Sequence, residues 1–139
     1  MLTIAGREAG IVGISPLRGN ATGFDHFAPT MATSGGRIEE QLSWISQAAG
    51  NRFEDLELSV LAHHLEVTDD IAATAEARAA AWDASPQQVL PSPHVFLGRP
   101  EEMIETLQVR RERYGISYVV FPAAEFEVVE QIVSKLAGT

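Results

Sequence analysis

The sequence predicts an α/β fold with parallel strands, and two observations carry the prediction. Short apolar runs alternate with longer amphipathic segments. The clearest case is Val95 to Leu97, then a helical segment from Pro100 to Gly115, then Tyr118 to Phe121. Strands that alternate with helices pair in parallel through right-handed crossovers. The predicted strands are also nearly continuous in apolar character, which is typical of burial on both faces.

Composition limits the classes of function. With 139 residues, of which 45% are hydrophobic and 21% charged, the chain fits a single soluble domain, residues 1–139. The net charge of −9 argues against nucleic acid and anionic membrane surfaces as partners. The absence of cysteine excludes disulfides and thiolate chemistry. Neither a membrane span nor a secretory leader is recognisable, so we expect a cytoplasmic protein.

The first part of the chain predicts a helix end, a strand, a long loop and a helix. Met1 to Glu8 has the pattern of a helix end, and Ile11 to Ile14 that of a short buried strand. Ser15 to Gly36 is rich in Gly and Pro and also holds aromatic residues. Such a long loop either folds over a site or is a surface loop. Arg37 to Ala49 carries a helical apolar stripe.

The second part continues the alternation. Leu56 to Val67 is predicted as one strand. Thr68 to Asp70 is a capping signal for an alanine-rich helix from Ile71 to Trp82. Ser85 to Leu90 predicts a short helix with Pro at its first position, and Ala124 to Leu136 predicts the last helix.

Three segments together resemble the luciferase-like monooxygenases, (β/α)8 enzymes that use a flavin or a deazaflavin. They are MLTIAGREAGIVGIS, IEEQLSWISQAAGNRFEDLELSVLAHHLEVTDD and SPHVFLGRPEEMIETLQVRRERYGISYVVF. The resemblance is closest to the actinobacterial-type deazaflavin-dependent branch. It rests on the order and spacing of the segments, since each motif alone occurs in many α/β proteins. It covers nearly the whole chain but only the C-terminal part of the family's domain.

The resemblance implies a partial TIM-barrel-like unit of three to four parallel strands with covering helices. Ile11 to Ile14, Leu58 to Ala62 and Tyr118 to Phe121 would be the sixth to eighth strands. The implied cofactor is flavin mononucleotide or the deazaflavin coenzyme. The first five strands of the family, which supply most contacts to the isoalloxazine, have no counterpart. Two interpretations follow: a truncated C-terminal part of an oxidoreductase, or a non-catalytic oligomerising remnant with no bound cofactor.

A barrel with too few strands to close is expected to self-associate. Three strands do not close an eight-stranded barrel, and two copies supply only six. Helices would cover the outer side of the strands and leave an apolar barrel-lining face and two sheet edges exposed. We therefore expect a homodimer or a higher assembly that buries this face.

Candidate site residues follow the strands, because barrel enzymes place their chemistry at the carboxyl ends. Ser15 and Asn20 follow the first strand and are candidates for cofactor binding. His63 and His64 lie at the end of the second and are catalytic candidates, since imidazole acts as an acid, a base or a ligand. Neighbouring strand residues point to opposite faces, so at most one of this pair faces a given site. The alternative is that both are partly exposed strand-end residues.

The turn at Gly98 and Arg99 is a candidate anion site, because backbone N–H groups and a guanidinium meet at a helix N-terminus. The family usually has Ser or Thr where Arg99 stands, so the usual cap is lost; the alternative is a solvated arginine. Glu101 and Glu102 fit the first turn of a helix and need no catalytic role. His94 is expected to fix a turn.

The remaining polar residues predict no further site. His26 is either a lid residue or an ordinary loop histidine. Arg110, Arg111 and Arg113 lie near a helix C-terminus, where positive charge is favourable, and predict no binding site. The four histidines lack metal-ligand spacing with Cys or acids, so we expect no metal.

Overall fold

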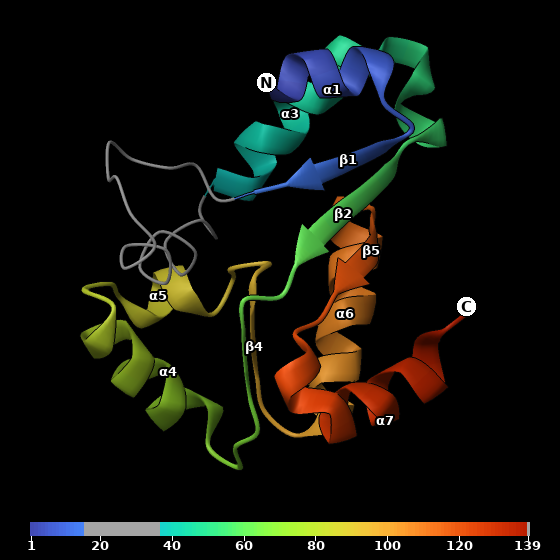
Figure 1. The fold of residues 1–139 in the computed structure, drawn as a ribbon. Helices are drawn as coiled ribbons and strands as arrows, with labels where there is room; N and C mark the ends of the chain where they lie inside the picture. The colour runs from blue at the N-terminus through green and yellow to red at the C-terminus, as the bar shows by residue number, and fades with distance from the viewer. Residues whose placement is uncertain (16–36, 139) are drawn as a thin grey trace.

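The chain forms an α/β structure, described here from a computed structural model for residues 1–15 and 37–138 (Figure 1). The strands are β1 (Ile11–Ile14), β2 (Glu57–Leu61), β3 (His64–Glu66), β4 (Val95–Leu97) and β5 (Ile116–Val120). The helices, in the numbering of Figure 1, are α1 (Leu2–Glu8), α3 (Ile38–Ala49), α4 (Ile71–Ala81), α5 (Pro86–Val89), α6 (Pro100–Tyr114) and α7 (Phe126–Leu136). The 3-10 helices η3 (Gly50–Asp55) and η4 (Ala123–Glu125) precede β2 and α7, respectively.

Three strands form a parallel sheet, which we call sheet A, in the order β1-β2-β5. Val12 pairs with Leu58 and Val60 with Val119, with a register shift between Leu58 and Ser59. The predicted α/β class and the parallel pairing of these three strands are thus confirmed. The last strand lies two residues earlier at its start than the predicted Tyr118 to Phe121 and begins directly after Gly115.

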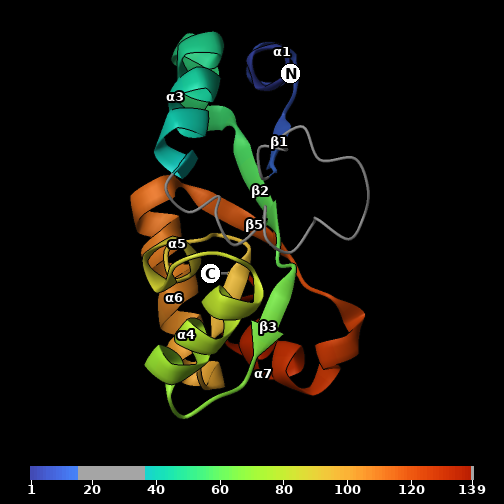
Figure 2. The same ribbon diagram turned by 90° about the vertical axis from the view of Figure 1, so that its left-hand side faces the viewer.

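The predicted single strand from Leu56 to Val67 is wrong. β2 ends at Leu61, and β3 then pairs in parallel with β4 in a second sheet, sheet B. The interruption arises at Ala62 and His63: Ala62 N–H still donates to Val120 O at 2.8 Å, whereas His63 N–H donates to His94 O at 2.9 Å. The chain therefore changes its partner strand at this point, and Figure 2 shows β3 continuing the course of β2.

Within residues 1–15 and 37–138, sheet A is covered on one side only, so the expected burial on both faces is wrong for this part of the structure. The covered side carries Val12, Ile14, Leu58, Val60 and Ile116, which pack against α1 and α3. Figure 1 shows these two helices together over β1. α1 packs so closely on α3 that a Cβ at Gly6 would lie 2.7 Å from the carbonyl oxygen of Ile45.

The opposite side of sheet A, which we call the open face, is exposed. Its apolar members are 54% exposed at Ile11, 42% at Leu61, 46% at Tyr118 and 41% at Val120. Exposed Glu57 and half-buried Ser59 lie among them, so the face is mixed in polarity. The expected exposed face is present and is less apolar than the resemblance implied.

Sheet B is buried on both sides. Val95 and Leu97 of β4 face α4 and α5 and pack with Ala75, Ala79 and Val89. Phe96 and Leu65 face the other way, toward a cluster formed with α6 and α7. The all-buried run of β4 explains why its sequence is continuously apolar.

The helix ends follow their sequence signals. Asp70 caps α4 by accepting a hydrogen bond from Ala73 N–H at 2.9 Å. α6 begins at Pro100 and ends at Gly115, which adopts a left-handed conformation with φ of 71°. Glu101 and Glu102 lie in the first turn of α6, as expected for helix-start residues.

Arg110 behaves unlike its neighbours Arg111 and Arg113. Its side chain is only 6% exposed and lies over the ring of Phe96, 4.5 Å from the ring centroid. Its guanidinium donates to the carbonyl oxygens of Pro93, at 3.4 Å, and Val95, at 3.1 Å. Burial lowers its pKa to about 10. Arg110 thus anchors α6 to β4. The favourable placement of positive charge near a helix C-terminus does not account for its buried position.

Replacing Arg110 by Met should destabilise the protein by about 1 to 3 kcal/mol, because two carbonyl groups lose a buried donor. The free energy of unfolding in urea measures this effect. The matched control is Arg113→Met on the same helix, whose exposed guanidinium pairs with Glu39 on the surface, so stability should change by less than about 1 kcal/mol. Equal losses for the two variants would contradict the anchoring role.

Candidate functional site

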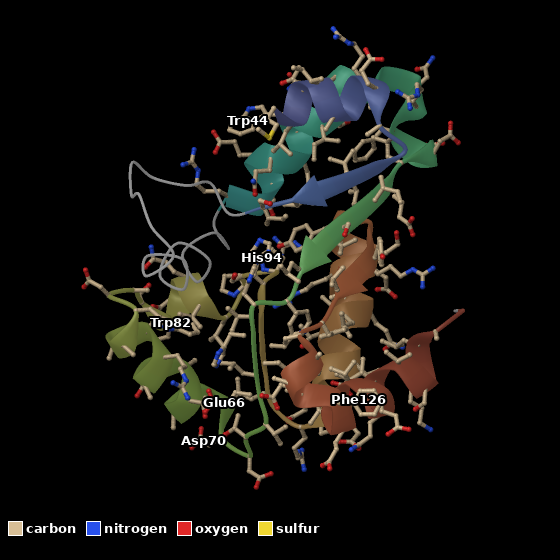
Figure 3. The ribbon with its side chains drawn as sticks, in the orientation of Figure 1. Trp44, Glu66, Asp70, Trp82, His94 and Phe126 are labelled. Carbon is tan, nitrogen blue, oxygen red and sulfur yellow. The ribbon has the colours of Figure 1, made fainter. Side chains whose placement is uncertain are left out.

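The candidate site lies where β2 ends, at the junction of sheets A and B. His94 occupies this junction, as Figure 3 shows, and its side chain is fully buried. Its Nδ1 lies 2.9 Å from Leu61 O, so Nδ1–H donates to that carbonyl and the tautomer is fixed. Nε2 then carries a lone pair, and within the described chain it is a buried atom with no hydrogen-bond partner.

Burial sets the protonation of His94. Removal from water lowers its pKa to about 4, with smaller contributions from the nearby charges of His63 and Arg110. The imidazole is therefore neutral at pH 7. A group with so low a pKa is a poor proton carrier at that pH, and its free Nε2 is better suited to accept a hydrogen bond.

His63, one of the two predicted catalytic residues, lies beside His94. Their ring centroids are 5.7 Å apart and the rings are tilted by 51°. Burial also lowers the pKa of His63. The backbone joins the pair further, because His63 N–H and His64 N–H both donate to His94 O, at 2.9 and 3.2 Å. The structure thus brings together His63 and His94, which are far apart in the sequence.

His64, the other predicted catalytic residue, has different neighbours. Its Nε2 lies 3.0 Å from Glu66 Oε2, and its ring meets Trp82 edge-on with centroids 5.0 Å apart. Arg78 donates to both carboxylate oxygens of Glu66, at 2.6 and 3.0 Å, and this lowers the pKa of Glu66 to about 2. The contacts join β3 to α4 in the lower part of Figure 3, where Glu66 and Trp82 are labelled. They give His64 a structural role.

The Gly98–Arg99 turn lies at the far end of sheet B from the histidine pair. Gly98 has φ of 123°, and a Cβ there would come within 3.0 to 3.2 Å of Glu102 and Ile71. Arg99 N–H donates to Glu102 Oε2 at 2.8 Å, and Arg99 Nε lies 3.3 Å from the same atom. The carboxylate of Glu102 therefore already occupies the place where an anion would bind.

The candidates after the first strand are only partly visible. Ser15 O accepts a hydrogen bond from Gln41 Nε2 at 2.6 Å, which ties the end of β1 to α3 through a buried side chain. Asn20 and His26 lie outside the described residues. No side-chain role for Ser15 follows from its contacts.

Sequence reasoning missed the pairing of His94 with His63. The signal was weak, because a histidine between Pro93 and a strand also fits a turn. It also missed the ion pair of Glu66 with Arg78, since a β3–α4 contact was invisible while Leu56 to Val67 was taken as one strand. In residues 1–15 and 37–138, no three His, Asp or Glu side chains gather closely enough to hold a metal ion. No helix of this described part is both long and apolar enough to span a bilayer.

Comparison with known proteins gives no relative: the chain matches no protein-family model, no curated protein and no solved structure.

The buried neutral His94 predicts a pH dependence of stability. Its pKa falls from the ordinary 6.5 to about 4 on folding, so the unfolded chain binds more protons between these values. The stabilisation that His94 contributes to the folded state is complete above pH 6.5 and is lost as the pH falls to 4. Over this range the free energy of unfolding changes by at most about 1.4 kcal/mol per pH unit.

Urea unfolding in steps from pH 7 to pH 4 measures this slope. His94→Gln should reduce this slope and leave the contributions of His63 and Glu66, whose pKa values are also lowered, whereas the control His64→Gln should retain the contribution of His94. An unchanged slope in His94→Gln would mean that His94 does not titrate between the two pH values.

Proposed function

We propose that this chain forms the sixth to eighth βα units of a luciferase-like oxidoreductase barrel that uses a flavin or a deazaflavin. One observation carries the proposal: three parallel strands pair in chain order, with helices on one side and an open face on the other. In a (β/α)8 barrel the helices lie outside and the inner strand faces line the barrel. The sequence resemblance assigns the same three strands to this position.

The histidine pair has a suitable place in such a barrel. Active sites of barrel enzymes lie at the carboxyl ends of the strands, and β2 ends at Leu61, two residues before His63. His94 orients this end by its bond to Leu61 O, and it places a neutral imidazole beside His63. In this proposal His63 contacts the bound molecule and His94 positions the strand end behind it.

The described residues fit the cofactor only in part. Leu61, Tyr118 and Val120 of the open face offer an apolar and aromatic wall for a flat ring system. The Gly98–Arg99 turn does not suit a phosphate, because Glu102 takes its N–H group and adds negative charge. The cofactor would supply hydride transfer or oxygen activation. This chain supplies one wall of the site.

Cofactor titration tests this proposal. The purified chain, mixed with flavin mononucleotide or with the deazaflavin coenzyme, should change the visible spectrum of one of them in a saturable way. Leu61→Lys should weaken this binding, because it places a charge in the apolar wall. The control Val109→Lys alters a residue that is 58% exposed on α6 and should leave binding unchanged. Absence of binding to both cofactors would refute the proposal for this chain.

The second candidate function is a non-catalytic α/β module that associates with itself. The four exposed apolar residues of the open face and the outer positions of β1 and β5 in sheet A favour it. Outer strands carry backbone groups that pair readily with another chain, and exposed apolar surface favours burial against a partner. In this case the open face buries itself against a second copy and binds no cofactor.

Sedimentation at micromolar concentration tests this second candidate. We expect a homodimer or a higher assembly. Tyr118→Lys should shift it toward the monomer, because a charge on the open face opposes burial, while Val109→Lys should not. A stable, well-folded monomer of the unaltered chain would exclude self-association through this face.

A further inference from the structure

A small cavity of about 80 Å³ lies between α5, β4 and α6. Arg110 is the only charged residue of its wall. A wider groove of about 420 Å³ adjoins the cavity, because Arg110 and Leu90 line both spaces. The rest of the cavity wall is mostly apolar and consists of Ile71, Val89, Val95, Leu97 and Thr106. The cavity therefore combines an apolar lining with one positive charge.

The charge of Arg110 has no carboxylate partner within residues 1–15 and 37–138. Its polar contacts are the carbonyl oxygens of Pro93 and Val95 and the ring of Phe96. Burial lowers its pKa, and Tyr114 is the one nearby charged or titratable group that opposes this effect. Arginine still stays protonated at pH 7, and a buried charge without an opposite charge destabilises the folded state. The described chain thus balances this charge by dipoles alone.

The guanidinium of Arg110 also has donors to spare. It carries five N–H groups, of which two donate to the carbonyl oxygens. Nε–H makes no hydrogen bond in the described chain, where His94 Nε2 is the only fully buried side-chain nitrogen or oxygen without a partner. Nε of Arg110 therefore reaches open space, and the spaces that Arg110 lines are the cavity and the groove. The hydroxyl of Thr106 donates to Glu102 O at 2.9 Å, so the free donors of the cavity come from Arg110.

We propose that this cavity binds a small planar oxyanion with one negative charge, a short carboxylate or bicarbonate, against the guanidinium of Arg110. Both partners are planar, so parallel N–H···O bonds join them. The volume of 80 Å³ limits the ligand to a few heavy atoms, since one water takes about 30 Å³ in the liquid. The site is separate from the histidine pair and does not depend on the proposed oxidoreductase activity.

The adjoining groove restricts the charge of the ligand. Glu102, Glu105 and Arg113 are the charged residues that line the groove but not the cavity. Glu102 pairs with Arg99, and Arg113 pairs with Glu39, so Glu105 is the one without an ion-pair partner in residues 1–15 and 37–138. A carboxylate near the entrance repels a second negative charge more than a first. Sulfate should therefore bind more weakly than acetate.

Two exposed apolar residues provide a matched pair of variants. Leu90 lines both the cavity and the groove and is 47% exposed, so a larger side chain there narrows the passage between them. Val133 of α7 is 46% exposed and lines neither space. Leu90→Trp should therefore block the site, and Val133→Trp should not.

The experiment is NMR of the full chain, in which the Nε–H signals of the arginines are followed at constant ionic strength. The ligands are sodium acetate, sodium bicarbonate, sodium sulfate and acetamide, the neutral planar analogue of acetate. We expect a saturable shift of the Arg110 signal with acetate or bicarbonate, with a dissociation constant of about 1 to 10 mM for so small a ligand. The tighter of the two identifies the source of the anion. Acetamide should cause no shift, and Leu90→Trp should abolish the response that Val133→Trp retains.

Arg113 is the internal control, because its guanidinium is exposed, pairs with Glu39 at 2.7 Å and does not line the cavity. Equal shifts of the Arg110 and Arg113 signals would mean a general salt effect and would overturn the proposal. The same holds for no saturable shift of Arg110 with either anion, for an equal response to acetamide, and for sulfate binding as tight as acetate binding.

Thermal unfolding establishes whether each variant is folded before the titration. A folded Leu90→Trp that binds acetate as well as Val133→Trp does would place the anion outside the cavity and would also overturn the proposal. If Leu90→Trp does not fold, the comparisons of acetate with acetamide and of Arg110 with Arg113 in the unaltered chain still decide.

Discussion

The bond between His94 Nδ1–H and Leu61 O holds the two sheets together, and the remaining architecture depends on it. β2 leaves sheet A at this point, and β3 begins sheet B only three residues later. A change of partner strand exposes backbone groups that need new hydrogen bonds. His94 satisfies three of them: its ring takes the carbonyl of Leu61, and its own carbonyl takes the N–H groups of His63 and His64.

This arrangement gives His94 two properties at once: it holds the backbone together, and it carries a buried lone pair that can accept a hydrogen bond. Fixing the tautomer through Nδ1 leaves Nε2 as a buried acceptor that has no hydrogen-bond partner among residues 1–15 and 37–138. An unsatisfied buried polar atom lowers stability, and such atoms are retained where they serve another purpose or where a polar group arrives with a ligand. The contact with His63 places this acceptor at the carboxyl end of a strand of sheet A.

The sequence predicted the α/β class, the parallel strands and most helix ends, because these depend on local signals. Pro100, Gly115 and Asp70 determine helix ends within a few residues of themselves. The split of Leu56 to Val67 into two strands could not be predicted, because it depends on the contact of Leu61 with His94, which lies 33 residues further along the chain. The same holds for the candidate site. His63 was predicted from its place after a strand, whereas its neighbour came from another part of the chain.

Arg110 shows how a single side chain restricts what evolution can substitute. Its fork contacts the carbonyl oxygens of Pro93, just before β4, and of Val95, the first residue of β4, and its flat face covers Phe96. A lysine would carry the same charge, but its compact ammonium group has neither the fork nor the plane. Lysine at position 110 would therefore keep the charge but not the shape that makes these contacts. Sequences that share this packing should keep arginine here.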